Sequence, residues 1–99
     1  MYSLTGTFTT AHGSRYLQQL CKHFAHKIDV SFEPEWGCLQ FPFGRVELRA
    51  DQSHLFVSCD TGDRDAADRC RAVVDSHLER FAFREAFTTM DWVLSGPDA

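Results

Sequence analysis

The sequence contains no long hydrophobic run and no recognisable targeting segment. No apolar stretch approaches the roughly 20 residues that a helix needs to cross a bilayer. Residues 1–7 (MYSLTGT) lack both the basic start and the apolar centre of a signal peptide. We therefore expect a cytoplasmic protein that does not associate with membranes.

The cysteines lack the spacing of a metal or redox motif. Cys21, Cys38, Cys59 and Cys70 include no C-x-x-C pair, which argues against a zinc ribbon or a thioredoxin-like site. In a reducing cytoplasm they should remain thiols. Each lies within or beside an apolar pattern, so we expect all four to pack in the core as small hydrophobic side chains. No cofactor is expected.

Several catalytic templates are also missing. The sequence has no Gly-rich phosphate loop, no G-x-S-x-G and no H-E-x-x-H. Its only lysines, Lys22 and Lys27, lie at a charged helix end, where neither is desolvated enough for Schiff-base chemistry. Cys21 and the nearby histidines project from different helix faces, so they do not form a nucleophile–base pair. No residue is predicted to be catalytic, and a protein without enzymatic activity is favoured.

The composition is that of one small soluble domain. The 99 residues are 43% hydrophobic and include nine Phe, two Trp and two Tyr, enough for one compact core. We expect this domain to span residues 1–94, with a disordered tail at residues 95–99. The net charge of −4 disfavours nucleic-acid binding, which depends on neutralising phosphates.

Hydrophobic periodicity predicts an α+β fold. Alternation of period two indicates strands, and apolar residues at helical spacing indicate two amphipathic helices, with Ser14 and Asp63 as N-caps. The order is a strand at 2–10, a helix at 15–27, four strands within 28–60 with turns near 34–35, 42–44 and 51–54, a helix whose apolar stripe runs over 66–81, and a strand at 88–93. An antiparallel sheet of five or six strands with both helices on one face buries both stripes. This β-α-β-β-β-β-α-β order resembles that of TATA-binding-protein-like folds, a likeness of fold that implies no DNA binding.

Histidines are the main candidates for a site. His23 and His26 stand three apart on the first helix and could supply two metal ligands, or they form a solvated helix end. His77 falls within the apolar stripe of the second helix. It is either a core imidazole bonded to a backbone carbonyl or to Tyr16, or a pocket residue that titrates near physiological pH.

Arginines and aromatics offer a second set of candidates. Arg45 and Arg49 could join Arg80 and Arg84 in an anion-binding patch, or all four are separate surface residues paired with glutamates. Phe56 falls on the polar side of its strand and predicts an exposed apolar patch, suited to a flat ligand or a partner protein.

Three separated segments resemble one bacterial family, the domain of unknown function 2218. They are RYLQQLCKHFAHK at 15–27, FPFGR at 41–45 and HLERF at 77–81, and the likeness covers residues 4–93. Family members are small proteins, some of them fused to or encoded beside siderophore-interacting ferric reductases. The resemblance thus implies iron or siderophore handling, with a ferric siderophore or its reductase as partner. It implies ligand contacts from Tyr16, His23, Phe43, Arg45, His77 and Arg80.

Two other functions remain open. The first is a protein–protein interaction domain that forms a homodimer through its exposed sheet face and binds no small ligand. The second is a small lyase, because a dihydroxyheptenedioate aldolase name is attached to some relatives of the family.

Overall fold

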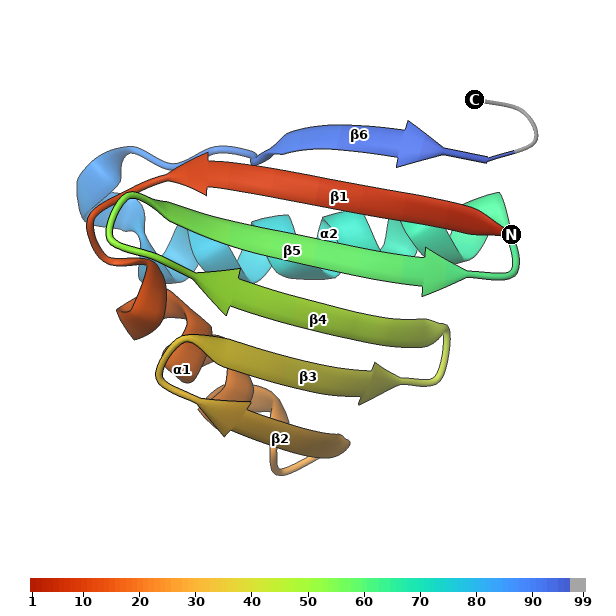
Figure 1. Cartoon of the computed structure of the whole chain (residues 1–99), viewed down its shortest axis with the longest axis horizontal. Helices are drawn as coiled ribbons and strands as arrows, with labels where there is room; N and C mark the ends of the chain where they lie inside the picture. Colours follow the sequence, from red (N-terminus) through yellow and green to blue (C-terminus); the bar gives the residue numbers. More distant parts are fainter. Residues whose placement is uncertain (97–99) are drawn as a thin grey trace.

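The computed structural model describes residues 1–96 (Figure 1). Eight regular elements and one short 3-10 helix follow each other in the expected order. They are β1 (Tyr2–Thr9), α1 (Gly13–Phe24), β2 (Asp29–Glu33), β3 (Trp36–Phe41), β4 (Gly44–Ala50), β5 (His54–Thr61), α2 (Arg64–Phe81), η1 (Phe83–Glu85) and β6 (Asp91–Ser95).

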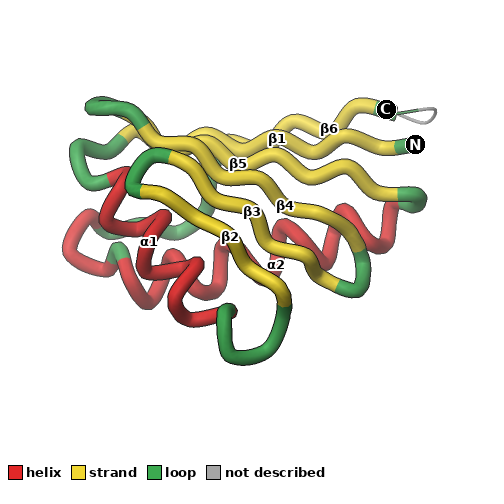
Figure 2. The backbone as a smooth tube through the Cα atoms, turned by 60° about the horizontal axis from the view of Figure 1, so that its bottom comes forward, coloured by secondary structure: helices red, strands yellow, loops and turns green. Residues whose placement is uncertain are grey.

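The strands form one antiparallel six-stranded sheet in the order β2-β3-β4-β5-β1-β6. Both helices cover one face of this sheet, and the other face is open (Figure 2). The predicted fold class is confirmed. Apolar and polar residues alternate along the strands because successive side chains of a strand point to opposite faces of the sheet. Each strand therefore turns one row of apolar side chains towards the helices.

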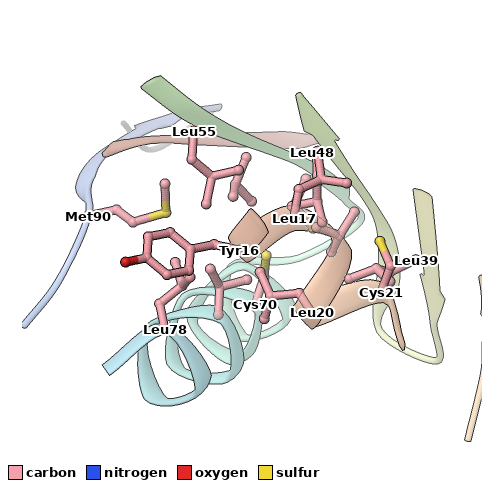
Figure 3. Close-up of a cluster of buried hydrophobic side chains, with 14 of the residues drawn as sticks. Tyr16, Leu17, Leu20, Cys21, Leu39, Leu48, Leu55, Cys70, Leu78 and Met90 are labelled. Atoms are coloured by element: carbon pink, nitrogen blue, oxygen red, sulfur yellow. The ribbon is translucent and has the colours of Figure 1, made fainter. Parts of the chain in front are cut away.

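The core lies between the helices and the covered face of the sheet. Leu17 and Leu20 of α1 are fully buried, as are Leu78 of α2 and Leu55 of β5 (Figure 3). Burial of each such side chain stabilises the fold by about 1.5–3 kcal/mol. The amphipathic pattern of each helix therefore determines which of its faces meets the sheet.

The first helix differs from its predicted limits. It begins at Gly13, with His12 as N-cap, so the prediction of Ser14 as the cap is wrong. The Ser14 hydroxyl instead donates to the carbonyl of Pro34. A Cβ at Gly13 would lie 2.6 Å from the carbonyl oxygen of His54, so only glycine allows the helix to start this close to the sheet. The helix also ends at Phe24 rather than at residue 27. By contrast, Asp63 caps α2 as predicted.

The last strand lies further along the chain than expected, at Asp91–Ser95. Trp92 holds this strand against the rest of the fold, because its indole Nε1 donates to Asp75 of α2 at 2.9 Å and its ring lies beside Gly6 of β1. Ser95, the first residue of the expected tail at residues 95–99, is the last residue of β6 and pairs with Ser3 of β1. The disorder expected for this tail stays a prediction. Residues 97–99 of this tail lie outside the described residues.

Cys38 is the exception among the thiols. The other three cysteines belong to the core beneath the helices, as predicted. Cys38 is buried too, at 5% exposure, but the register places it opposite Glu47 on the open face of the sheet. The prediction of four core cysteines is therefore wrong at this position.

Neither of the two helices in the described part of the chain combines the length and hydropathy needed to span a membrane.

Candidate functional site

His23 and His77 come together where the end of α1 meets α2. Their ring centroids are 4.8 Å apart. The Nδ1 of His77 lies 2.7 Å from the carbonyl oxygen of Val73, one turn earlier in α2. Since a carbonyl only accepts, the Nδ1 of His77 is the donor of this hydrogen bond. The backbone partner considered for His77 is present, and His23 is its neighbour across the helix seam.

A chain of aromatic rings extends from this pair across the covered face of the sheet. The Phe24 ring lies 4.7 Å from that of His77, and Phe41 is 5.0 Å further on. Phe43, in the β3–β4 turn, stacks on Phe41 at 4.8 Å. We call this group the imidazole–aromatic cluster; its members are His23, His77, Phe24, Phe41, Phe43 and Phe81.

The surroundings of the cluster are positively charged. Desolvation lowers the pKa of His23, and the nearby positive groups of His77, Lys27, Arg80 and His26 lower it further. No carboxylate takes part in this shift. Within residues 1–96, neither Lys27 nor Arg80 forms an ion pair. The site therefore presents a neutral His23 imidazole at neutral pH beside two cations without ion-pair partners in the described part of the chain, which is an environment for an anion.

His23 and His26 were expected as possible metal ligands, and the structure places a third imidazole, that of His77, beside His23. Among the described residues, no group of three or more His, Cys, Asp or Glu side chains is placed to hold a metal ion. The arrangement thus provides two facing imidazoles, which could accept hydrogen bonds or make two contacts to a ligand.

Tyr16 lies elsewhere, near the opposite end of α1. Its hydroxyl donates to the Glu85 carboxylate, which also accepts from Thr10 at 2.8 Å. Burial, then the hydrogen bond to Glu85, raises the pKa of Tyr16 to about 12. Tyr16 therefore joins α1 to the segment after α2 and contributes nothing to the imidazole–aromatic cluster.

Arg45 lies on the opposite, open face of the sheet. Its Nε donates to the Cys38 sulfur at 3.0 Å, and its guanidinium is 3.9 Å from Glu47. Arg49 approaches the same carboxylate at 3.5 Å. The hypothesis of one patch that also includes Arg80 is therefore wrong, because the sheet separates the two pairs of arginines. The contact between Arg45 and Cys38 was not expected; only the β3–β4 register reveals it.

Of the six predicted contact residues, the structure gathers His23, His77 and Phe43 in one cluster, with Arg80 beside it.

The model of one bacterial family, "Uncharacterized protein conserved in bacteria (DUF2218)", matches residues 5–93. The chain belongs to this family. The DUF2218 resemblance of the three sequence segments is thereby confirmed.

One solved structure supports the DUF2218 fold directly. The NMR structure of PA4090 from Pseudomonas aeruginosa is similar with a TM-score of 0.77 and 29% sequence identity, covering 96% of each chain. No curated protein matches the sequence. Family and neighbour together define the domain and its architecture, while its chemistry has to be argued from the side chains.

Proposed function

We propose that this DUF2218 domain is a non-catalytic binding module of cytoplasmic iron or siderophore metabolism, and that its imidazole–aromatic cluster binds an anionic ferric chelate. The observation that carries the proposal is the pairing of His23 with His77 beside unpaired Lys27 and Arg80. These positive groups would attract an anion, and no carboxylate is among the groups that shift the pKa of His23.

The chemistry of ferric siderophores suits this surface. Ferric catecholate complexes carry negative charge and present flat rings, and ring faces stack well against phenylalanine and imidazole. Lys27 and Arg80 would neutralise the charge, and the exposed edge of the His23 ring would contact the ligand. A siderophore reductase would deliver or receive the chelate.

Calorimetric titration of the purified protein tests the proposal. We expect micromolar binding of a ferric catecholate, weaker binding of an uncharged ferric hydroxamate, and little binding of the iron-free chelators. Arg80→Gln should weaken the catecholate affinity about fivefold, the loss of one Coulombic contact of roughly 1 kcal/mol near the surface. Arg64→Gln is the matched control, since it removes the same charge from the other end of α2.

Two results would count against this function. One is an absence of binding at micromolar concentrations for every ferric chelate. The other is an equal loss of affinity in Arg80→Gln and Arg64→Gln, because that would indicate a diffuse charge effect with no localised site.

An interaction domain is the alternative, favoured by apolar side chains on the open face of the sheet. Phe56 is 37% exposed and Val93 is 61% exposed. Sedimentation at increasing concentration would then detect a dimer that Phe56→Ser weakens, whereas a strict monomer would argue against it. The lyase expectation stays a prediction of the family resemblance.

A further inference from the structure

A cavity of about 600 Å³ opens at one end of the sheet, on the side away from the imidazole–aromatic cluster. It lies where the β2–β3 turn and the β4–β5 turn meet, and the amide of Ala50 donates to the carbonyl of Glu35 at 3.1 Å to join the two turns. The lining side chains that matter here are Glu33, Glu35, Trp36, Arg49, Asp51 and Phe56.

Two aromatic rings are held at this cavity. Trp36, Arg49 and Phe56 occupy one row across β3, β4 and β5, on the open face. The indole Nε1 of Trp36 donates to Glu47 at 3.2 Å, which fixes the ring orientation. Phe56 stacks with His54 at 5.3 Å and an interplanar angle of 25°. The cavity therefore offers preoriented ring surface that remains partly exposed to solvent.

The charge of the lining is negative. Glu33 and Glu35 form no ion pair or side-chain hydrogen bond within the described residues. Asp51 accepts the amides of Ser53 and His54, both at 2.8 Å, and these bonds lower its pKa, so it stays ionised.

Arg49 is the one cation of this lining, it lies between Trp36 and Phe56 in their row, and it shares the Glu47 carboxylate with Arg45. The Nε of Arg49 lies 3.5 Å from the carboxylate of Glu47, which does not line the cavity. The three carboxylates of Glu33, Glu35 and Asp51 outnumber this one cation, although Asp51 also lies 3.5 Å from Nδ1 of His54. Glu33 stands directly opposite Trp36 in the pairing of β2 with β3, on the side of the indole away from Arg49. Carboxylates combined with aromatic faces are the chemistry that recognises organic cations, through Coulomb attraction and cation–π contact.

We propose that this cavity binds a guanidinium or alkylated ammonium group, as a site separate from the imidazole–aromatic cluster. The charged head would lie over the Trp36 ring, on the side of Glu33 and away from Arg49, with Glu33 and Glu35 as counterions. A free small molecule and an arginine side chain of a peptide share this chemistry, and the titration distinguishes them.

Nitrogen-15 NMR of the full chain tests the site, because the indole N–H of Trp36 faces the open side while that of Trp92 is bonded to Asp75. Trp36→Phe assigns the two signals. Agmatine, choline and a capped Gly-Arg-Gly peptide are added in turn, with benzoate as the anion of matched size. We expect a saturable shift of the Trp36 signal with the cations and no comparable shift of the Trp92 signal. Binding of agmatine indicates a small-molecule site, and binding of the peptide alone indicates a partner side chain.

Two variants sharpen the test. Glu33→Gln should weaken binding of the best cation about fivefold, because one unit of opposing charge is lost. Asp29→Asn is the matched control: Asp29 lies on the same strand and face, outside the cavity lining, and should leave the affinity unchanged. The proposal is overturned if no cation gives a saturable shift, if benzoate shifts the Trp36 signal equally, or if Asp29→Asn weakens binding as much as Glu33→Gln.

Discussion

The imidazole of His77 lies 4.8 Å from that of His23, ring centroid to ring centroid, across the seam between the two helices. Desolvation lowers the pKa of His23, and the positive charge of His77 this close lowers it further. The proximity of Lys27 and Arg80 acts in the same direction. Protonation of His23 is therefore disfavoured in the folded chain.

The first prediction concerns the pH dependence of stability. The folded pKa of His23 is below its ordinary value of 6.5, so the unfolded chain binds a proton there more readily than the folded chain. The contribution of His23 is fully present above pH 6.5 and is lost as the pH falls below that value. Urea unfolding at pH 7.5 and 5.5 should therefore show a smaller acid-induced loss in His23→Phe than in the natural chain. An equal loss in both would contradict the prediction.

The second prediction concerns the contact between Trp92 and Gly6. A Cβ at Gly6 would lie 2.7 Å from the indole ring, so Gly6→Ala must displace Trp92 and weaken its bond to Asp75. We expect a loss of about 1–3 kcal/mol in the free energy of unfolding. Gly62→Ala is the matched control, because within residues 1–96 no atom outside Gly62 and its two chain neighbours lies within 4 Å of the added Cβ. Thermal unfolding of both variants measures the difference, and similar losses would refute it.

The third prediction concerns the start of α2. The Asp63 carboxylate accepts the amide of Ala66 at 2.7 Å, and removing it leaves that donor without its cap. Asp63→Ala should cost about 1 kcal/mol of stability. Asp68→Ala, an exposed aspartate of the same helix, should cost much less. Chemical denaturation with circular dichroism tests this; a loss in Asp68→Ala as large as in Asp63→Ala would contradict the capping role.

The fourth prediction concerns Tyr16 at high pH. Its pKa is about 12 in the folded chain against 10.0 ordinarily, so the folded state favours the neutral phenol. That stabilisation is present below pH 10 and is lost as the pH rises towards 12. Ultraviolet titration should detect one tyrosine that ionises late, and Tyr16→Phe should remove this signal. Loss of the bond to Glu85 should also cost about 1 kcal/mol. If the signal that Tyr16→Phe removes titrates near pH 10, the prediction is wrong.

Local chemistry made the elements predictable from the sequence. Two types of side chain alternate along residues 2–9, and the apolar residues of α2 recur at helical spacing. Each of these patterns predicts which face of its segment is buried. Asp63 was predictable as a cap because the apolar stripe of α2 begins three residues after it, at Ala66. The start of α1 was not, since Gly13 is required by its approach to the His54 carbonyl on β5, a contact between segments distant in the sequence.

Only the tertiary structure decided which of the candidate residues lie close together. Helical spacing placed His77 in a buried stripe but could not say that His23 faces it, because that depends on how α1 and α2 pack on one sheet. Likewise, period two assigned Cys38 to a strand, and the register with β4 placed it beside Arg45 on the open face. Periodicity reports the environment of one segment, whereas a site requires the relative position of several. That position is set by strand order and helix packing, which are long-range interactions.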